Sequence, residues 1–129
     1  MNILIAEDDL ASRKYLYKWM SKYGSCDMTV DGIEAVEAFT IALDMGNPYD
    51  LVCLDIMMPK VDGIKALKAI RDIEKQRGTP EGRRAKIIMT SALNEDDVVS
   101  DSLTAGSEAF VTKPINLGQM EALIKDLLA

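Results

Sequence analysis

The chain has 129 residues, which is a typical length for one domain and is long enough to bury a core. Hydrophobic residues make up 48% and charged residues 28%, the balance of a soluble globular protein, and the formal net charge of −6 argues against a general nucleic-acid binder. No apolar run is long enough to span a bilayer, and Cys26 and Cys53 are too few for a disulfide framework, so we expect a cytoplasmic protein without membrane insertion.

Short apolar runs predict five strands, and residues at helical spacing predict helices between them. The runs are Ile3–Ala6, Met28–Val30, Leu51–Leu54, Ile87–Met89 and Ala109–Val111. Helical faces are marked by Leu16, Trp19, Met20 and Tyr23 and, near the C-terminus, by Leu117, Met120, Ile124 and Leu127. Start signals stand at Asp31 with Glu34 and at Asn116 with Gln119, and stop signals at Gly24 and Gly106. The alternation predicts an α/β fold, a doubly wound (βα)5 parallel sheet with helices on both faces.

The connection before the fourth strand, RGTPEGRRAK at 77–86, is rich in Gly and Arg and contains a Pro. This composition predicts an exposed loop. A solvated turn is the favoured interpretation, and a basic docking loop is the alternative.

Polar residues gather where the predicted strands end, which is the ligand-binding edge of an open parallel sheet. These residues are Glu7, Asp8 and Asp9 after strand one, Asp55 at the end of strand three, Thr90 and Ser91 on strand four, and Lys113 after strand five. Converging carboxylates repel one another unless a proton or a hard divalent cation joins them. Oxygen ligands in a chain without histidine favour Mg²⁺, with Mn²⁺ as the alternative ion. Acids away from the strand ends are interpreted as helix caps or as residues on solvated helix faces: Glu34, Glu37, Asp96 and Asp97. Asp9, taken alone, is interpreted in the same way.

Four segments that contain these polar residues resemble the receiver domain of bacterial two-component response regulators, and the resemblance runs from Ile3 to Leu128. They are ILIAEDD at the acidic end of strand one, LVCLDIMMPKVDG at the phosphoacceptor strand and its loop, IIMTSA at the hydroxyl strand, and AGSEAFVTKP at the lysine strand. The resemblance implies the flavodoxin-like strand order 2-1-3-4-5. We expect one receiver domain over residues 1–129, with no output domain.

The resemblance assigns a role to each matching residue of the acidic edge. Asp55 is the implied phosphoacceptor, and Asp8 is a direct Mg²⁺ ligand. Glu7 would act on the metal largely through water, and the backbone carbonyl of Met57 would complete the protein ligands. Lys113 would offer a second positive charge to the phosphoryl group.

The resemblance also implies a switch. Ser91 is the implied switch hydroxyl, preferred to Thr90 because its spacing to Lys113 fits the family. Phe110 takes the place of the switch aromatic, which is Tyr in many relatives. The Lys113–Pro114 bond is expected to be cis, as is common in the family.

The implied function is a phosphoacceptor switch and not an enzyme. The donor would be a phosphohistidine of a histidine kinase or histidine phosphotransfer protein, since this chain has no histidine. We expect output to a downstream protein target through the face of the fourth helix, fifth strand and fifth helix, with a homodimer as an option and no direct nucleic-acid contact. The helix over 95–105 has a weak apolar stripe, which permits movement: Val98, Val99 and Leu103.

The lifetime of the phosphorylated state depends on water reaching Asp55. In the family, the residues two beyond the phosphoacceptor and two beyond the switch hydroxyl flank that approach. Here they are Met57 and Leu93, both apolar, which predicts slow loss of phosphate, although Asn94 and Glu95 offer nearby polar groups.

Three alternative classes fit parts of the pattern. An aspartyl-phosphate hydrolase of the haloacid-dehalogenase type needs an acid two positions after Asp55, where Met57 stands. A flavodoxin-like cofactor carrier needs a phosphate loop after strand one, where the acids would repel phosphate. A degenerate receiver, acting only as an interaction module, would lack part of the set of site residues, and no part is missing.

Overall fold

Five parallel strands form one sheet in the order β2-β1-β3-β4-β5 in the computed structural model, which describes residues 1–92 and 96–128. The strands are β1 (Asn2–Ala6), β2 (Ser25–Thr29), β3 (Leu51–Asp55), β4 (Lys86–Ser91) and β5 (Ala109–Thr112). The helices are α1 (Leu10–Met20), α2 (Gly32–Asp44), α3 (Gly63–Gln76), α4 (Asp96–Thr104) and α5 (Leu117–Leu128), with a short 3-10 helix at Glu81–Arg83. The doubly wound α/β class and the order 2-1-3-4-5 are confirmed. Within the described ranges, no helix combines the length and the apolar character that a membrane crossing requires.

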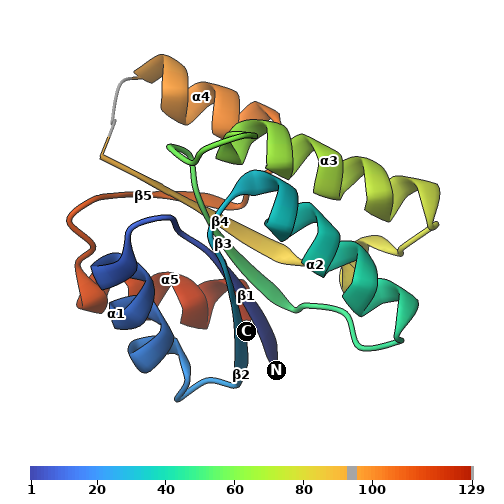
Figure 1. The fold of residues 1–129 in the computed structure, drawn as a ribbon, viewed down its shortest axis with the longest axis horizontal. Helices are drawn as coiled ribbons and strands as arrows, with labels where there is room; N and C mark the ends of the chain where they lie inside the picture. Colours follow the sequence, from blue (N-terminus) through green and yellow to red (C-terminus); the bar gives the residue numbers. More distant parts are fainter. Residues whose placement is uncertain (93–95, 129) are drawn as a thin grey trace.

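Helices cover both faces of the sheet (Figure 1). α1 and α5 lie on one face, and α2 and α3 lie on the other, where Val98 of α4 also packs. Strand residues alternate between the two cores, so that Cys53 faces α1 and α5 while Leu54 faces α2 and α3. Asp55, two residues after Cys53, therefore belongs to the α1/α5 face.

β3 is buried along its whole length, as expected for a central strand of a parallel sheet. Cys53 lies in the middle of this strand, and only 1% of the residue is exposed. Burial raises the pKa of its thiol to about 12. The thiol is therefore neutral at physiological pH and serves as a small core side chain.

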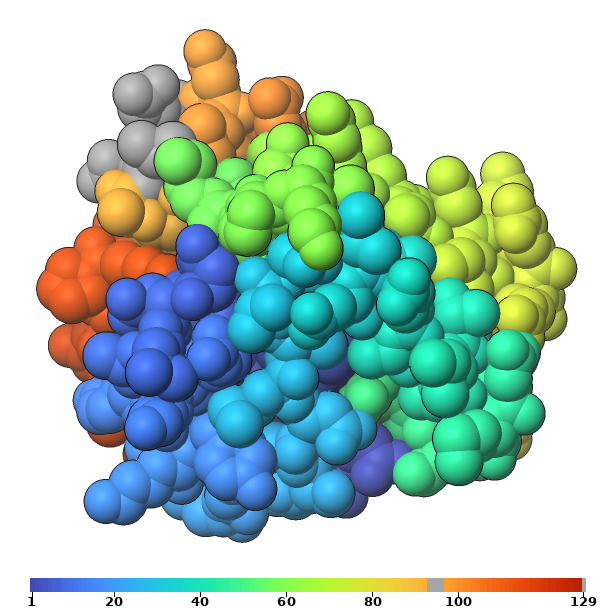
Figure 2. Space-filling model, viewed as in Figure 1, coloured from blue at the N-terminus to red at the C-terminus, as the bar shows by residue number. Residues whose placement is uncertain are grey.

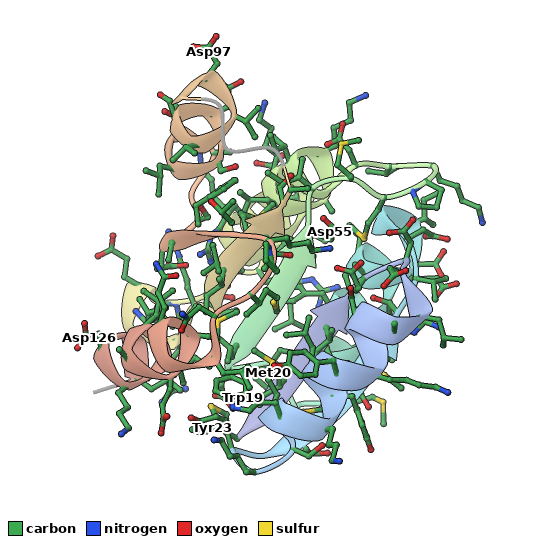
Figure 3. The ribbon with its side chains drawn as sticks, turned by 90° about the vertical axis from the view of Figure 1, so that its left-hand side faces the viewer. Trp19, Met20, Tyr23, Asp55, Asp97 and Asp126 are labelled. Atoms are coloured by element: carbon green, nitrogen blue, oxygen red, sulfur yellow. The ribbon has the colours of Figure 1, made fainter. Side chains whose placement is uncertain are left out.

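Two expectations about element boundaries were wrong. β2 begins earlier than the apolar run Met28–Val30, and Met28 is 45% exposed. β2 is an edge strand that pairs with β1. The hydrogen-bond ladder to β1, and not the hydrophobicity of its residues, therefore sets the length of β2. α1 ends at Met20, and Tyr23 lies in the following turn, where its ring contacts Trp19 edge-on at 5.3 Å between centroids (Figure 3).

The predicted helix starts are confirmed by their hydrogen bonds. Asp31 accepts the Glu34 N–H at 2.8 Å, and the Glu34 carboxylate accepts the Val30 N–H at 3.2 Å. Asn116 accepts the Gln119 N–H at 3.0 Å. Of the stop signals, Gly106 follows α4 with φ +112°, a conformation that glycine adopts without strain, and Gly24 lies in the turn beyond α1.

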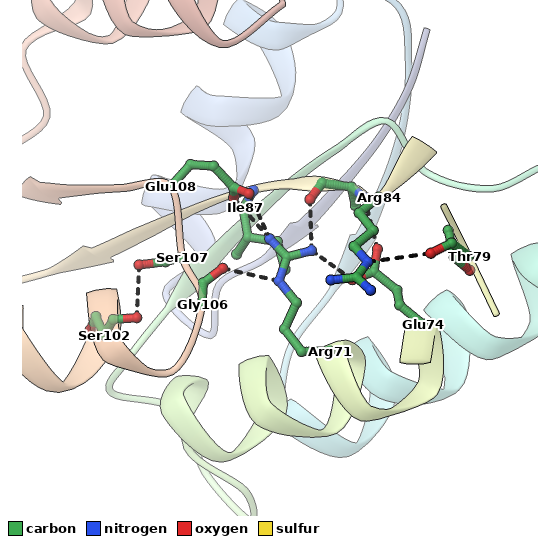
Figure 4. A network of polar contacts seen from close by, with 10 residues as sticks. Arg71, Glu74, Thr79, Arg84, Ile87, Ser102, Gly106, Ser107 and Glu108 are labelled. Carbon is green, nitrogen blue, oxygen red and sulfur yellow. Dashed lines mark hydrogen bonds and ion pairs between the residues drawn. The ribbon is translucent and has the colours of Figure 1, made fainter. Parts of the chain in front are cut away.

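A partly buried arginine, Arg71, ties α3 to the start of β4 and to the α4–β5 turn (Figure 4). Arg71 Nη1 donates to Glu74 at 2.6 Å and to the Ala85 carbonyl at 2.9 Å, and Nη2 contacts both Glu108 oxygens at 2.9 Å. Arg71 Nε donates to the Gly106 carbonyl at 3.0 Å. Glu74 is 1% exposed, and its other oxygen accepts the Ala85 N–H at 2.8 Å. We call Arg71, Glu74 and Glu108 the Arg71 clamp.

Most of the connection at 77–86 is exposed or partly exposed, as predicted, although Ala85 is buried, and it projects at the edge of the molecule in the space-filling view (Figure 2). It is nevertheless a folded turn. Arg77 pairs with Asp44 of α2 at 2.6 Å, and Arg84 Nε contacts the Thr79 carbonyl at 3.4 Å. Because β4 starts here, the connection lies at the end of the sheet opposite to Asp55.

Candidate functional site

The carboxyl ends of β1 and β3 bring three acids together. One carboxylate oxygen from each of Glu7, Asp8 and Asp55 lies within 4.8 Å of the others. β1 and β3 are neighbouring parallel strands with Ala6 opposite Leu54, so the residues that follow meet at one edge. Glu7 and Asp55 are buried and Asp8 is exposed, and Asp55 stands at the end of β3 (Figure 3).

Lys113 reaches into this cluster from the end of β5. Its Nζ lies 2.6 Å from Glu7 Oε2 and 3.2 Å from Asp55 Oδ2. The backbone N–H of Lys113 donates to the Ser91 carbonyl at 2.8 Å, which holds the residue against β4. The Lys113–Pro114 bond is cis, as the resemblance implied.

The electrostatics of the cluster favour an added cation. Burial raises the pKa of Glu7, although the hydrogen bond from Lys113 works in the other direction. Burial alone would lower the pKa of Lys113, but the hydrogen bond to Glu7 and the charge of Asp55 outweigh it, and the pKa is raised. One lysine therefore stands among three carboxylates. The donors that Glu7, Asp8 and Asp55 offer are all oxygens, which fit Mg²⁺.

The loop after β3 positions Asp55 through backbone contacts. Asp55 Oδ1 accepts the Met57 N–H at 3.3 Å, and Gly63 donates its N–H to the Ile56 carbonyl at 2.9 Å. A Cβ on Gly63 would lie 2.2 Å from the Asp55 carbonyl oxygen, so only glycine lets α3 begin this close to the strand. The Met57 side chain is 59% exposed.

Asp9 does not join the cluster of acids that could share a metal; it caps α1, as interpreted from the sequence. Its carboxylate accepts the Ser12 N–H at 2.9 Å, and this hydrogen bond lowers the pKa of Asp9. Glu34, Glu37 and Asp97 are exposed, which confirms the solvated-face interpretation. The side chain of Asp96 lies outside the described part of the chain.

The two predicted switch residues lie on the other face of the sheet. Ser91 is the last residue of β4 and is fully buried. Phe110 is half-buried and packs against the α2/α3 core, as does its strand neighbour Met89. By alternation Ser91 shares this face, and it ends β4 at the same edge of the sheet at which β3 ends in Asp55.

The sequence did not predict two contacts made by basic residues at the loops that follow β1 and β3. Arg13 Nη1 donates to the carbonyls of Glu7 at 3.0 Å and Asp8 at 3.4 Å, which fixes the backbone of the acidic pair. Lys60 has φ +66° and its Nζ lies 3.5 Å from Asp31, which ties the β3–α3 loop to α2. Neither contact follows a local pattern; the only available signal was a basic residue near an acidic segment.

A groove opens beside Lys113, between α1 and the β5–α5 connection. Its volume is about 710 Å³. The lining residues are Ala11, Ser12, Tyr15, Ala92, Lys113, Pro114 and Ile115. A mostly apolar surface therefore borders Lys113, the lysine that contacts Asp55.

The response regulator receiver domain family model matches residues 3–125. The chain belongs to this family. It is a receiver domain of two-component signal transduction, and its relatives include chemotaxis proteins and histidine kinases that carry such a domain. Receiver domains are signalling switches.

Three comparisons illustrate the relationship. The chemotaxis protein CheY of Treponema pallidum is 31% identical over 116 residues, covering 88% of this chain and 73% of that protein. CheY in the CheX–CheY–BeF3–Mg complex of Borrelia burgdorferi superposes with a TM-score of 0.84 at 31% identity, over 100% of this chain and 90% of that one. The match to the complex of Ypd1 with the Ssk1 receiver domain of Saccharomyces cerevisiae has a TM-score of 0.79 at 30% identity, over 98% and 86%.

Other relatives are much longer than this chain. It spans 12% and 8% of the length of histidine kinases that it matches in Oryza sativa and Schizosaccharomyces pombe. The receiver domain thus occurs in relatives both almost alone and as a small part of a large kinase.

Proposed function

We propose that the chain is a phosphoacceptor switch in which Asp55 takes a phosphoryl group in the presence of Mg²⁺. One observation carries the proposal. The buried Asp55 carboxylate is held by Lys113 at 3.2 Å and by the Met57 N–H at 3.3 Å, with oxygens of Glu7 and Asp8 beside it. A carboxylate at the carboxyl end of a strand, next to one lysine and two further acids, is well placed for nucleophilic attack on phosphorus.

The proposed reaction moves one phosphoryl group from nitrogen to oxygen. An Asp55 oxygen attacks the phosphorus of a phosphohistidine on a histidine kinase or phosphotransfer protein, the new O–P bond forms, and the imidazole leaves with the electrons of the N–P bond. Lys113 turns from Asp55 to the phosphoryl oxygens. Bound Mg²⁺ or Mn²⁺, held by Glu7, Asp8, Asp55 and the Met57 carbonyl, would supply positive charge that offsets repulsion between the two anions.

The proposed partners are proteins. The complex of Ypd1 with the Ssk1 receiver domain supports a phosphotransfer donor, and the apolar groove beside Lys113 offers a docking surface next to Asp55. Output would pass to a downstream protein, or to a second copy of the chain. In this proposal residues 1–129 act as one receiver domain in the cytoplasm.

Phosphorylation by a small donor tests the proposed function. With acetyl phosphate and Mg²⁺, the natural chain should gain one phosphoryl group by intact mass, and chelation of the metal should abolish the gain. Asp55→Asn keeps the shape and removes the nucleophile, so it should gain none. Asp9→Asn, which changes the cap of α1 outside the cluster, is the matched control and should still be modified. Modification that persists in Asp55→Asn would exclude the assignment.

Phosphorylation should alter the surface formed by α4, β5 and α5. Ser102 is the only residue of α4 that is buried among those described, and Leu103 is 48% exposed, so this helix is weakly anchored. Ser91 and Phe110 would shift together in a population change between two states. Hydrogen exchange with and without a beryllium fluoride complex should differ mainly in α4 and β5. A change confined to β2 and α2 would contradict this output face.

The phosphorylated state should be long-lived because the thioether side chain of Met57 cannot position an attacking water through a strong hydrogen bond. Met57→Asn with Leu93→Glu should release phosphate at least about fivefold faster in Mg²⁺, the effect of one added hydrogen bond in the transition state. Met57→Leu is the control and should leave the rate unchanged. The described residues do not include Leu93, Asn94 and Glu95. Met57→Asn alone is therefore the variant that changes only a residue whose position the structure describes. Equal release from polar and natural chains would refute the idea.

A further inference from the structure

Thr90 carries a hydroxyl whose burial is otherwise unexplained. The residue is 1% exposed, and its Oγ1 has no hydrogen-bond partner among residues 1–92 and 96–128. A buried hydroxyl without a partner destabilises a fold, and valine would fill the same space without that cost. The position of Thr90 points to a reason for the hydroxyl.

Strand register places Thr90 on the floor of the phosphoacceptor site. Thr90 lies opposite Asp55 on β3 and opposite Val111 on β5. Asp55 follows Cys53 onto the α1/α5 face, and Thr90 follows Ile88 onto the same face. Val111 also lies on this face, and Lys113 comes two residues later.

The Lys113 side chain must cross β4 to reach its partners. The sheet order puts β4 between β5, from which Lys113 extends, and β3, which carries Asp55. The ammonium nevertheless lies 3.2 Å from Asp55 Oδ2 and 2.6 Å from Glu7 Oε2 on β1. The last residue of β4 on this face is Thr90. In the strand register Thr90 therefore stands between Val111, two residues before Lys113 on β5, and Asp55 on β3.

We propose that Thr90 is a positioning residue for Lys113; the inference rests on the proposed phosphorylation of Asp55. In the unphosphorylated chain the ammonium is held by Glu7 and Asp55, and the Thr90 hydroxyl has no hydrogen-bond partner among the described residues. When a phosphoryl group joins Asp55, the ammonium turns to its oxygens and gives up its contact with Asp55. The Thr90 hydroxyl then accepts one of the freed N–H bonds and holds the lysine over the phosphoryl group.

The test compares Thr90→Val, which keeps the shape and removes the hydroxyl, with Thr90→Ser, which keeps the hydroxyl. Phosphorylation rates are measured against acetyl phosphate concentration in Mg²⁺, together with the thermal midpoint of the unphosphorylated proteins. Thr90→Val should lower the rate at saturating donor about tenfold, as expected for one lost hydrogen bond to a charged group, with the half-saturating concentration changed less than twofold. Its thermal midpoint should equal or exceed that of the natural chain. Thr90→Ser should keep the natural rate within twofold.

The remaining outcomes overturn the inference in distinguishable ways. A natural chain that takes no phosphoryl group would refute the proposed function, and the role of Thr90 with it. A natural chain that is phosphorylated no faster than Thr90→Val would refute the role of Thr90 alone. Thr90→Ser slowed as much as Thr90→Val would show that only packing matters. A Thr90→Val chain that melts below the natural one would show that the hydroxyl already supports the resting fold.

Discussion

Lys113→Met should destabilise the unphosphorylated chain by on the order of 3 kcal/mol at pH 7 without Mg²⁺, because breaking a buried ion pair leaves uncompensated charge. Lys113 is the partner of two buried acids, since the side chains of Glu7 and Asp55 are 1% and 4% exposed. Without the ammonium, these acids and Asp8 would repel one another or take up a proton. Urea unfolding of both proteins measures the loss.

Magnesium and a surface control separate this effect from lost packing. Added Mg²⁺ should restore part of the stability of Lys113→Met, since the ion binds only the folded acidic cluster. Lys125→Met removes an exposed lysine that pairs with Glu121 at 3.5 Å, and it should change stability by less than about 0.5 kcal/mol. A Lys113→Met chain as stable as the natural one would mean that the lysine does not offset the charge of the acids.

Arg71→Met should also destabilise the fold, by about 3–5 kcal/mol. The substitution leaves Glu74, which is 1% exposed, without its cation and removes donors from the carbonyls of Ala85 and Gly106. Urea unfolding measures the global loss. Hydrogen exchange should rise first at the α4–β5 turn and at the start of β4, where the Arg71 clamp holds the backbone together.

A second variant tests whether the buried charge is the cause. Arg71→Met with Glu74→Met removes both partners, so it should recover part of the stability lost by Arg71→Met alone. Arg77→Met is the matched control, because the Arg77–Asp44 pair has side chains 44% and 57% exposed, and it should cost less than about 1 kcal/mol. A double variant less stable than Arg71→Met would show that the packing of these side chains outweighs their charges.

The acidic site was predictable because the carboxyl ends of parallel strands lie at the same edge of the sheet. The positions of Glu7, Asp55 and Lys113 along the chain were enough to place them together, once the strands had been recognised. The helix caps Asp9, Asp31 and Asn116 were equally predictable, since a cap is a local hydrogen bond between residues three apart.

The features that escaped prediction depend on distant contacts. The length of β2 follows from its ladder to β1, which the composition of β2 does not encode. The Arg71 clamp joins residues 37 apart in the chain, and an arginine on a helix gives no sign of which carbonyls it will reach. Thr90 was grouped with the polar residues at the strand ends, but only the register of β4 shows that it lies opposite Asp55.

Chemical mapping of the modified residue tests directly whether Asp55 is the phosphoacceptor. Borohydride reduces an aspartyl phosphate to homoserine, so the natural chain is treated with acetyl phosphate and Mg²⁺, reduced, digested and sequenced by mass spectrometry. We expect homoserine at position 55 and no reduced side chain at the other acids of the cluster. Homoserine at position 8, or 2-amino-5-hydroxypentanoic acid (the alcohol formed from glutamyl phosphate) at position 7, with an unchanged Asp55 would contradict this assignment. A phosphorylated chain that yields no homoserine would contradict it as well.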